Sequence, residues 1–406
     1  MKQDALTNVA DHLLKPLAVR MPDTRWLRRE ATLNTPEFDL AYVRSRPDGP
    51  PSGPPSVPAV IIPGGPGLAS VFPYRGLRRQ ATKDGLDVIM VEHRGVGLSR
   101  EDLTGEPLPR SAMWIDYVLD DIAAVLDAEQ VDRVFVAGSS YGSYLASAFA
   151  TKYPHRVEGL LLDSALQSTK DLSVERRSVR ALFWDNETRV AELVRTLTFA
   201  GVDQRTLLDA TRAAYELSGS TLVEKMLSRQ VHNHRSMSWS ALTTYARRDP
   251  SIAGIPGYYE FNIAGTIGFR ELNYGAKPDG KPLDPALTYS LIADDFPKFE
   301  GEPYDLPAAA PHFDFPVGLL VGDRDLRTPP EIALRTATLA PHAALGTISN
   351  GHSALDTHPL AFEKALKLLV TGKIERLPEL APALSALPNR ALTDPFVKAM
   401  GLLSGY

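Results

Sequence analysis

The sequence predicts an α/β protein, built on a mostly parallel sheet with helices on both faces and interrupted by an inserted, mainly helical cap. Short apolar segments of strand length alternate with amphipathic helical segments up to about Ala165, and the alternation resumes at Phe315. Strand, helix and strand in repetition imply parallel strands joined by right-handed crossovers. Between the two stretches the patterns are mainly helical, which indicates the cap.

Composition excludes several classes of protein. The 406 residues carry 44 Lys and Arg against 49 Asp and Glu, a net charge of −5, so bulk charge does not indicate nucleic acid or a membrane surface as a partner. No apolar run approaches the roughly 18 residues of a membrane span. Zero cysteines leave no disulfide, thiolate nucleophile or Cys-based zinc site. The N-terminus, with Asp4 and Asp11, lacks the apolar segment of a secretory signal, and we expect a cytoplasmic protein.

The chain begins with a predicted β-hairpin. Two extended segments, 26–33 and 37–44, flank a short turn at Asn34 and Thr35. The stretch 47–58 contains six prolines, which exclude a helix or an interior strand, so it is predicted to be a loop.

The alternating strands and helices of the core follow in two stretches, one before the cap and one after it. The predicted elements are strands at 59–62, 88–91, 134–137 and 157–162 with helices from 115 to 126 and from 142 to 153, and later strands at 317–321 and 345–349 with helices opening near Thr328 and from 359 to 372. The expected division is a core in two parts, residues 1–165 and 311–375, a cap at 166–310, and a Pro- and Ala-rich tail at 376–406 whose structure stays undecided.

The strongest chemical signal is a G-x-S-x-G pattern, Gly138 to Gly142, between a predicted strand and a predicted helix. In this context the central serine, Ser140, occupies a strained turn that raises its hydroxyl above the sheet. The residues two before and two after it need to lack side chains, and both are glycine. Ser140 is therefore the candidate nucleophile.

A serine nucleophile needs a histidine base that is held by an acid, expected in the chain order Ser, Asp, His. Of nine histidines, His352 alone lies in a Gly-containing loop directly after a late strand. The acid could be Asp323 or Asp325, after the strand 317–321, with Asp163 a third choice. We choose Asp325 and interpret Asp323 as a turn former.

A second signal is the glycine-rich turn Pro63-Gly64-Gly65-Pro66-Gly67 at the end of an early strand. Acyl transfer needs two N–H donors for the oxyanion, one from the residue after the serine and one from a loop after such a strand. We assign the backbone N–H groups of Tyr141 and Gly65. A phosphate-binding loop would need a following Lys-Ser or Lys-Thr, which is absent, and no metal constellation is visible in the sequence.

These motifs carry a family resemblance. PGGPG at 63–67, EHRGVGLS at 92–99, GSSYG at 138–142, GDRDLRTP at 322–329 and NGH at 350–352 together resemble the prolyl aminopeptidase (proline iminopeptidase) and tripeptidyl aminopeptidase branch of the α/β-hydrolases. The resemblance implies the α/β-hydrolase fold, and a triad and oxyanion donors at the residues assigned above. Four positions depart from it. Prolyl aminopeptidases usually have His before GGPG and Trp after the serine, where this chain has Pro63 and Tyr141, and the usual DQRG is EHRG here.

The leading functional hypothesis is a serine aminopeptidase that releases an N-terminal residue, proline being the candidate, from short peptides through an acyl-enzyme. The alternatives are a carboxylesterase with the same triad and a non-enzymatic member that binds a small ligand. The expected partner is a small peptide or ester, with no cofactor, metal, nucleic acid or membrane; the sequence leaves the oligomeric state open.

An aminopeptidase must recognise the cationic amine next to the scissile carbonyl, and a carboxylate in a partly dry pocket does this through a hydrogen bond worth roughly 1.5 to 3 kcal/mol. The stretch 257–274 embeds two carboxylates among five aromatic residues. In the resembled aminopeptidases the cap supplies such an acid just before the sheet resumes. Glu271 matches that position best and Glu260 second; the alternative is that Glu271 pairs with a neighbouring arginine on the cap surface.

Overall fold

The computed structural model describes residues 23–32, 36–47, 57–232, 237–246 and 257–389. Within them, eight strands form one sheet in the order β1-β2-β4-β3-β5-β6-β7-β8. The pairs β1–β2 and β2–β4 are antiparallel, and the other neighbouring pairs are parallel. The strands are β1 (Thr24–Glu30), β2 (Glu37–Ser45), β3 (Ala59–Ile62), β4 (Val88–Val91), β5 (Val134–Ser139), β6 (Val157–Asp163), β7 (Val317–Gly322) and β8 (Ala343–Ile348).

This sheet confirms the predicted fold class. β5 and β7 are buried along their whole length, as expected of central parallel strands that are covered on both faces. β8, at the edge, alternates between buried and more exposed residues. The predicted hairpin is present as the β1–β2 pair, with Glu30 opposite Glu37. Its turn at Asn34 and Thr35, and residues 48–56 of the predicted loop, lie outside the described residues.

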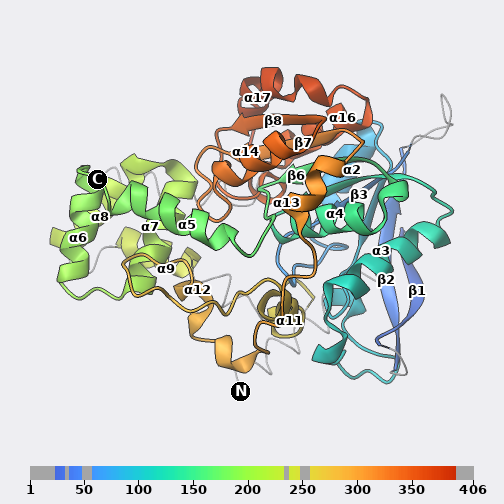
Figure 1. Cartoon of the computed structure of the whole chain (residues 1–406), viewed down its shortest axis with the longest axis horizontal. Helices are drawn as coiled ribbons and strands as arrows, with labels where there is room; N and C mark the ends of the chain where they lie inside the picture. Colours follow the sequence, from blue (N-terminus) through green and yellow to red (C-terminus); the bar gives the residue numbers. More distant parts are fainter. Residues whose placement is uncertain (1–22, 33–35, 48–56, 233–236, 247–256, 390–406) are drawn as a thin grey trace.

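Helices cover both faces of the sheet (Figure 1). Buried apolar residues of α3 (Ile115–Ala128), α4 (Tyr141–Lys152) and α14 (Pro330–Leu339) form one core cluster with inward-facing strand residues. Those of α2 (Arg75–Lys83), α16 (Pro359–Val370) and α17 (Leu377–Ser385) form a second cluster on the opposite face. Two of these helices are additions to the sequence prediction: α2 had no predicted counterpart, and α17 occupies the segment left undecided.

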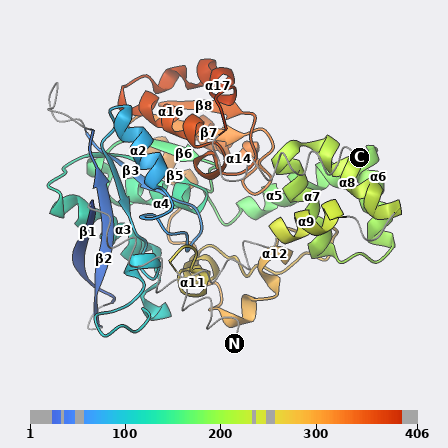
Figure 2. The ribbon, with the colours of Figure 1, turned by 180° about the vertical axis from the view of Figure 1, so that it is seen from behind.

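A bundle of helices stands to one side of the sheet and encloses a third apolar cluster (Figures 1 and 2). Its helices are α5 (Asp171–Phe183), α6 (Arg189–Phe199), α7 (Gln204–Ser218), α8 (Ser220–His232) and α9 (Met237–Ala246). The later helix α11 (Phe261–Glu271) behaves differently, because its Ile263 and Ile267 belong to the core cluster on the α3 face of the sheet. Among the described helices, none combines the length and the apolar character that crossing a membrane requires.

Candidate active site

Ser140 lies at the sharp turn between β5 and α4 and has backbone angles of φ 54° and ψ −122°. This left-handed conformation is strained for a residue with a side chain. The flanking glycines permit it. A Cβ added at Gly138 would lie 2.0 Å from the carbonyl oxygen of Gly142, and one added at Gly142 would lie 2.2 Å from the carbonyl oxygen of Ile62. The turn can therefore form only because both positions lack a side chain.

The structure brings Ser140, His352 and Asp325 together from three strand ends. The Nε2 atom of His352 lies 2.9 Å from Oγ of Ser140, and Nδ1 lies 3.0 Å from each carboxylate oxygen of Asp325. Asp325 is 1% exposed. The chain of hydrogen bonds has the geometry of a serine nucleophile, its general base and the acid that orients the base.

The electrostatics of the pair favour an ionised acid beside the histidine. Burial by itself raises the pKa of Asp325, but the charge and hydrogen bond of His352 outweigh it, and the pKa lies below the usual range. Burial likewise lowers the pKa of His352, and the Asp325 carboxylate more than offsets this, so its pKa lies above the usual 6.5. Asp325 also accepts hydrogen bonds from the backbone N–H groups of Arg327 (3.0 Å) and Thr328 (2.9 Å), which stabilise the carboxylate.

The two other candidate acids hold the loop that carries the histidine. Asp163, fully buried at the end of β6, accepts from the N–H groups of Ala354 (3.0 Å) and Leu355 (2.9 Å), and burial raises its pKa to about 6. Asp323 accepts from the N–H group of Asn350 at 3.1 Å. Neither has a hydrogen bond to the imidazole among those found in the described residues, so the geometry selects Asp325.

The glycine-rich turn lies against the serine. A Cβ added at Gly64 would be 3.4 Å from Cβ of Ser140, and Gly64 and Gly65 line the same pocket as its side chain. Gly65 has φ +130°, and a Cβ there would lie 2.7 Å from the nitrogen of Gly67, so only glycine fits. Tyr141 is the first residue of α4, where backbone N–H groups have no intrahelical acceptor. Both expected oxyanion donors are thus carried by segments adjoining Ser140.

Ser140 and His352 open into a cavity of about 870 Å³ between the sheet and the helical bundle. Its wall combines residues from β-strand ends, α5, α7 and the segment 258–289. The side chains that give it chemical character are Tyr74, Tyr258, Tyr259, Tyr274, Tyr289, Asp171, Glu175, Glu216, Asp356, Arg212, Arg324 and Arg327. A space of this size accommodates a substrate of several residues or a drug-sized molecule.

Two glutamates of this wall form a charged group beside the triad. Glu175 on α5 pairs with Arg212 at 3.1 Å, and Glu216 on α7 pairs with Arg327 at 3.5 Å. Burial raises the pKa of Glu175 to about 7, even though Arg212 and Arg327 lower it. The sequence analysis missed both acids, because each lies within an ordinary amphipathic helical pattern and no motif marks it.

Glu271 and Glu260, the acids expected to bind substrate, are not among the residues that line this cavity. Glu271 is buried at the end of α11 and accepts a 2.7 Å hydrogen bond from the N–H group of Ile115, at the start of α3, where an anion is favourable. Glu260 accepts from the N–H group of Gly97 and pairs with Arg100 at 3.2 Å. Both bind backbone of the core because α11 packs on the sheet rather than over the serine.

Within the part of the chain that the structure describes, no group of three or more His, Asp or Glu side chains is placed to hold a metal ion.

The chain is similar to known hydrolases. Residues 58–359 match the model of the α/β hydrolase fold family. A curated relative named 2-hydroxy-6-oxo-2,4-heptadienoate hydrolase, from Pseudomonas putida, is 27% identical over 157 residues, 37% of this chain and 51% of the relative. A proline iminopeptidase from Thermoplasma volcanium is 32% identical over 106 residues, 26% of this chain and 33% of the relative. The matches therefore span only half and a third of these relatives' lengths.

Among solved structures, that of a proline iminopeptidase from Mycobacterium smegmatis superposes with a TM-score of 0.53 at 16% identity, covering 86% of this chain and 99% of that one. At this identity the similarity shows a shared fold alone.

Proposed function

The chain belongs to the α/β hydrolase fold family, and we propose that it is a serine hydrolase that removes the N-terminal residue, with proline as the candidate, from short peptides. The observation that carries this proposal is the hydrogen-bonded chain from Ser140 through His352 to Asp325, which opens into the 870 Å³ cavity. Among the relatives that match part of the chain, the one named proline iminopeptidase supports the same activity.

In the proposed mechanism the Ser140 hydroxyl attacks the carbonyl carbon of the first residue while His352 takes its proton. The N–H groups of Gly65 and Tyr141 stabilise the oxyanion of the tetrahedral intermediate. The carbon–nitrogen bond then breaks, His352 returns the proton to the leaving amine, and an acyl-enzyme remains. Water, activated by the same histidine, hydrolyses the ester and restores Ser140. Asp325 holds the ring in the productive tautomer throughout.

In this proposal an acidic side chain of the cavity wall binds the substrate amine. Glu175 is the best candidate, because it lines the cavity and its pKa of about 7 marks a carboxylate that burial leaves poorly stabilised. An ammonium group beside it would stabilise the ionised form through a charge-assisted hydrogen bond. Glu216, which lines the same wall, is the second candidate.

A carboxylesterase is the second candidate function, and the ion pairs of the wall favour it. Glu175 and Glu216 already face Arg212 and Arg327, so an uncharged ester could occupy the cavity without disturbing either pair.

The experiment compares turnover of aminoacyl-β-naphthylamides, with free and blocked amines, with turnover of p-nitrophenyl esters. An aminopeptidase cleaves the free-amine amides and rejects the blocked ones, and Ser140→Ala abolishes the activity. Glu175→Gln should raise KM for free-amine substrates and spare esters of similar size. Glu271→Gln is the matched control, because this buried glutamate lies outside the cavity wall and should affect both substrate types equally. Efficient cleavage of esters without cleavage of amides would refute the aminopeptidase proposal and favour the carboxylesterase.

A further inference from the structure

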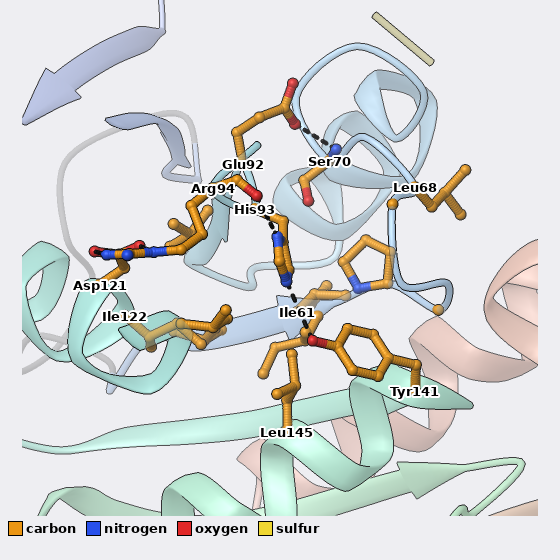
Figure 3. Close-up of a pocket in the computed structure, with 17 residues that line it drawn as sticks. Ile61, Leu68, Ser70, Glu92, His93, Arg94, Asp121, Ile122, Tyr141 and Leu145 are labelled. Atoms are coloured by element: carbon orange, nitrogen blue, oxygen red, sulfur yellow. Dashed lines mark hydrogen bonds and ion pairs between the residues drawn. The ribbon is translucent and has the colours of Figure 1, made fainter. Parts of the chain in front are cut away.

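A second, much smaller cavity of about 30 Å³, large enough for a single water molecule, lies behind the glycine-rich turn (Figure 3). The side chain of Tyr141 enters it from the start of α4, and His93 enters it from the segment after β4. The two rings are 6.0 Å apart between centroids. Tyr141 is 1% exposed and lines this small cavity but not the large one, while its backbone adjoins Ser140.

A hydrogen bond joins these two side chains with a defined direction. Nδ1 of His93 lies 2.6 Å from the carbonyl oxygen of Arg94, which can only accept, so the proton of the neutral ring is on Nδ1. Nε2 is then an acceptor, and the Tyr141 hydroxyl donates to it at 3.1 Å. Burial lowers the pKa of His93 to about 4, and the imidazole therefore stays neutral at neutral pH.

The segment that carries His93 is itself anchored on both sides. The carboxylate of Glu92 accepts from the backbone N–H groups of Ser70 and Val71, in the loop that continues from the glycine-rich turn. The guanidinium of Arg94 binds both carboxylate oxygens of Asp121 on α3, at 2.7 and 2.8 Å. His93 thus stands between the loop that carries one expected oxyanion donor and the helix that begins with the other.

From this arrangement we propose that the hydrogen bond between His93 and the Tyr141 hydroxyl positions the backbone N–H of Tyr141 as an oxyanion donor. The inference rests on the proposed serine hydrolase activity. Tyr141 is the first residue of the helix after the strained turn at Ser140, and the hydroxyl at the end of its side chain is hydrogen-bonded to His93. The tie restricts rotation of the Tyr141 peptide, so the N–H direction is set before the substrate arrives. Preorganised donors of this kind account for much of the rate acceleration in acyl transfer.

The test measures kcat and KM separately for Tyr141→Phe and His93→Leu, with p-nitrophenyl acetate and with whichever naphthylamide the wild-type protein cleaves. We expect kcat to fall about 10- to 100-fold in each, less than the 10²- to 10³-fold cost of removing a donor outright, with KM within about twofold of wild type. The double variant should lose no more than His93→Leu alone, because Tyr141→Phe breaks a hydrogen bond that His93→Leu has already removed. Binding of a substrate-derived aldehyde, which forms the tetrahedral adduct, should weaken by the same factor as kcat falls.

Two controls separate positioning from a merely structural role. Tyr144→Phe removes another buried hydroxyl of α4, which donates to the carbonyl oxygen of Tyr304 at 3.3 Å, and should leave kcat unchanged. His93→Gln keeps a side chain that can accept from Tyr141 and should recover most of the kcat lost in His93→Leu. If His93→Leu folds poorly, His93→Gln still tests the proposal.

Wild-type kcat in Tyr141→Phe, additive losses in the double variant, or a loss confined to KM would overturn the inference while leaving the proposed activity intact. Failure of the proposed activity has a different signature: the wild-type protein would then turn over no ester or amide, or Ser140→Ala would be as active as wild type.

Discussion

Replacing Asp325 by asparagine tests how the acid acts on His352. In the wild type, Oδ1 accepts from the backbone N–H groups of Arg327 and Thr328, and Oδ2 accepts from the Thr328 hydroxyl at 2.9 Å. An asparagine amide must keep its oxygen where the two N–H donors are, because its NH₂ group there would face other donors. The NH₂ group therefore takes the place of Oδ2, 3.0 Å from Nδ1 of His352.

That orientation favours the wrong tautomer, although the amide oxygen at the Oδ1 position, also 3.0 Å from Nδ1, competes for the ring proton. With an amide N–H pointing at it, Nδ1 becomes an acceptor and the ring proton moves to Nε2, the atom that must accept the proton of Ser140. The loss expected for a triad base in the wrong tautomer is about 10⁴-fold in kcat, which at about 1.36 kcal/mol per factor of ten is roughly 5.5 kcal/mol of transition-state stabilisation. The two backbone hydrogen bonds to residue 325 are conserved, and the Thr328 hydroxyl can turn to accept from the new NH₂ group, so the fold should persist.

The assay is kcat and kcat/KM of Asp325→Asn with the best ester or amide substrate, together with the midpoint of thermal unfolding. Asp323→Asn is the matched control, because Asp323 contacts the N–H group of Asn350 instead of the imidazole, and should lose no more than about tenfold. If Asp325→Asn keeps more than a tenth of wild-type kcat, or Asp323→Asn loses as much as Asp325→Asn, the assignment of the orienting acid is refuted.

Three further predictions concern the turn, the histidine and a buried acid. Gly142→Ala should yield little folded protein in a solubility and circular dichroism assay, because the new Cβ would lie 2.2 Å from the carbonyl oxygen of Ile62; a stable, active variant would contradict the turn geometry. Since the base must be neutral and the pKa of His352 is raised above 6.5, kcat/KM should fall on acidification with a midpoint above pH 6.5, and a midpoint below 6 would contradict it. Burial raises the pKa of Glu363 to about 7 despite the nearby Lys364. The folded state therefore binds this proton more tightly than the unfolded state does. The stability that the group contributes is present below about pH 4.5 and is lost as pH rises through 7. Relative to wild type, Glu363→Gln should therefore gain up to about 3 kcal/mol in free energy of unfolding between pH 5 and pH 8, measured by urea denaturation; equal pH dependence of the two proteins would rule this out.

The fold class was predictable because the periodicity of apolar residues is a local property. The strand β5 is buried on both faces and begins with four consecutive apolar residues, 134–137, while α3 buries one stripe, and both patterns are visible in a short window. α2 was missed because it is strongly polar, with Arg78 and Ala81 its only buried residues, so its sequence shows little apolar periodicity. The structure of 1–22 and 390–406 lies outside the described residues.

That Ser140, Asp325 and His352 come together was also predictable, because each sits in a short motif at a strand end and parallel strands bring such ends to one edge of the sheet. The choice among Asp163, Asp323 and Asp325 was harder, since all three follow strands. It depends on which carboxylate reaches the imidazole, and a difference of two residues along a loop decides that.

The alternation of strands and helices, the strained turn at Ser140 and the order of the acid and histidine after it are encoded locally, because these features depend on neighbours along the chain. Which glutamates line the large cavity depends on how the helices pack: Glu271 accepts a hydrogen bond from the start of α3, while Glu175, unmarked by any motif, lies in the cavity wall. The tertiary structure also brings two of the motif departures, His93 and Tyr141, into contact. Such contacts join residues 48 or more positions apart, and their geometry follows from how whole helices pack on the sheet, which no local pattern encodes.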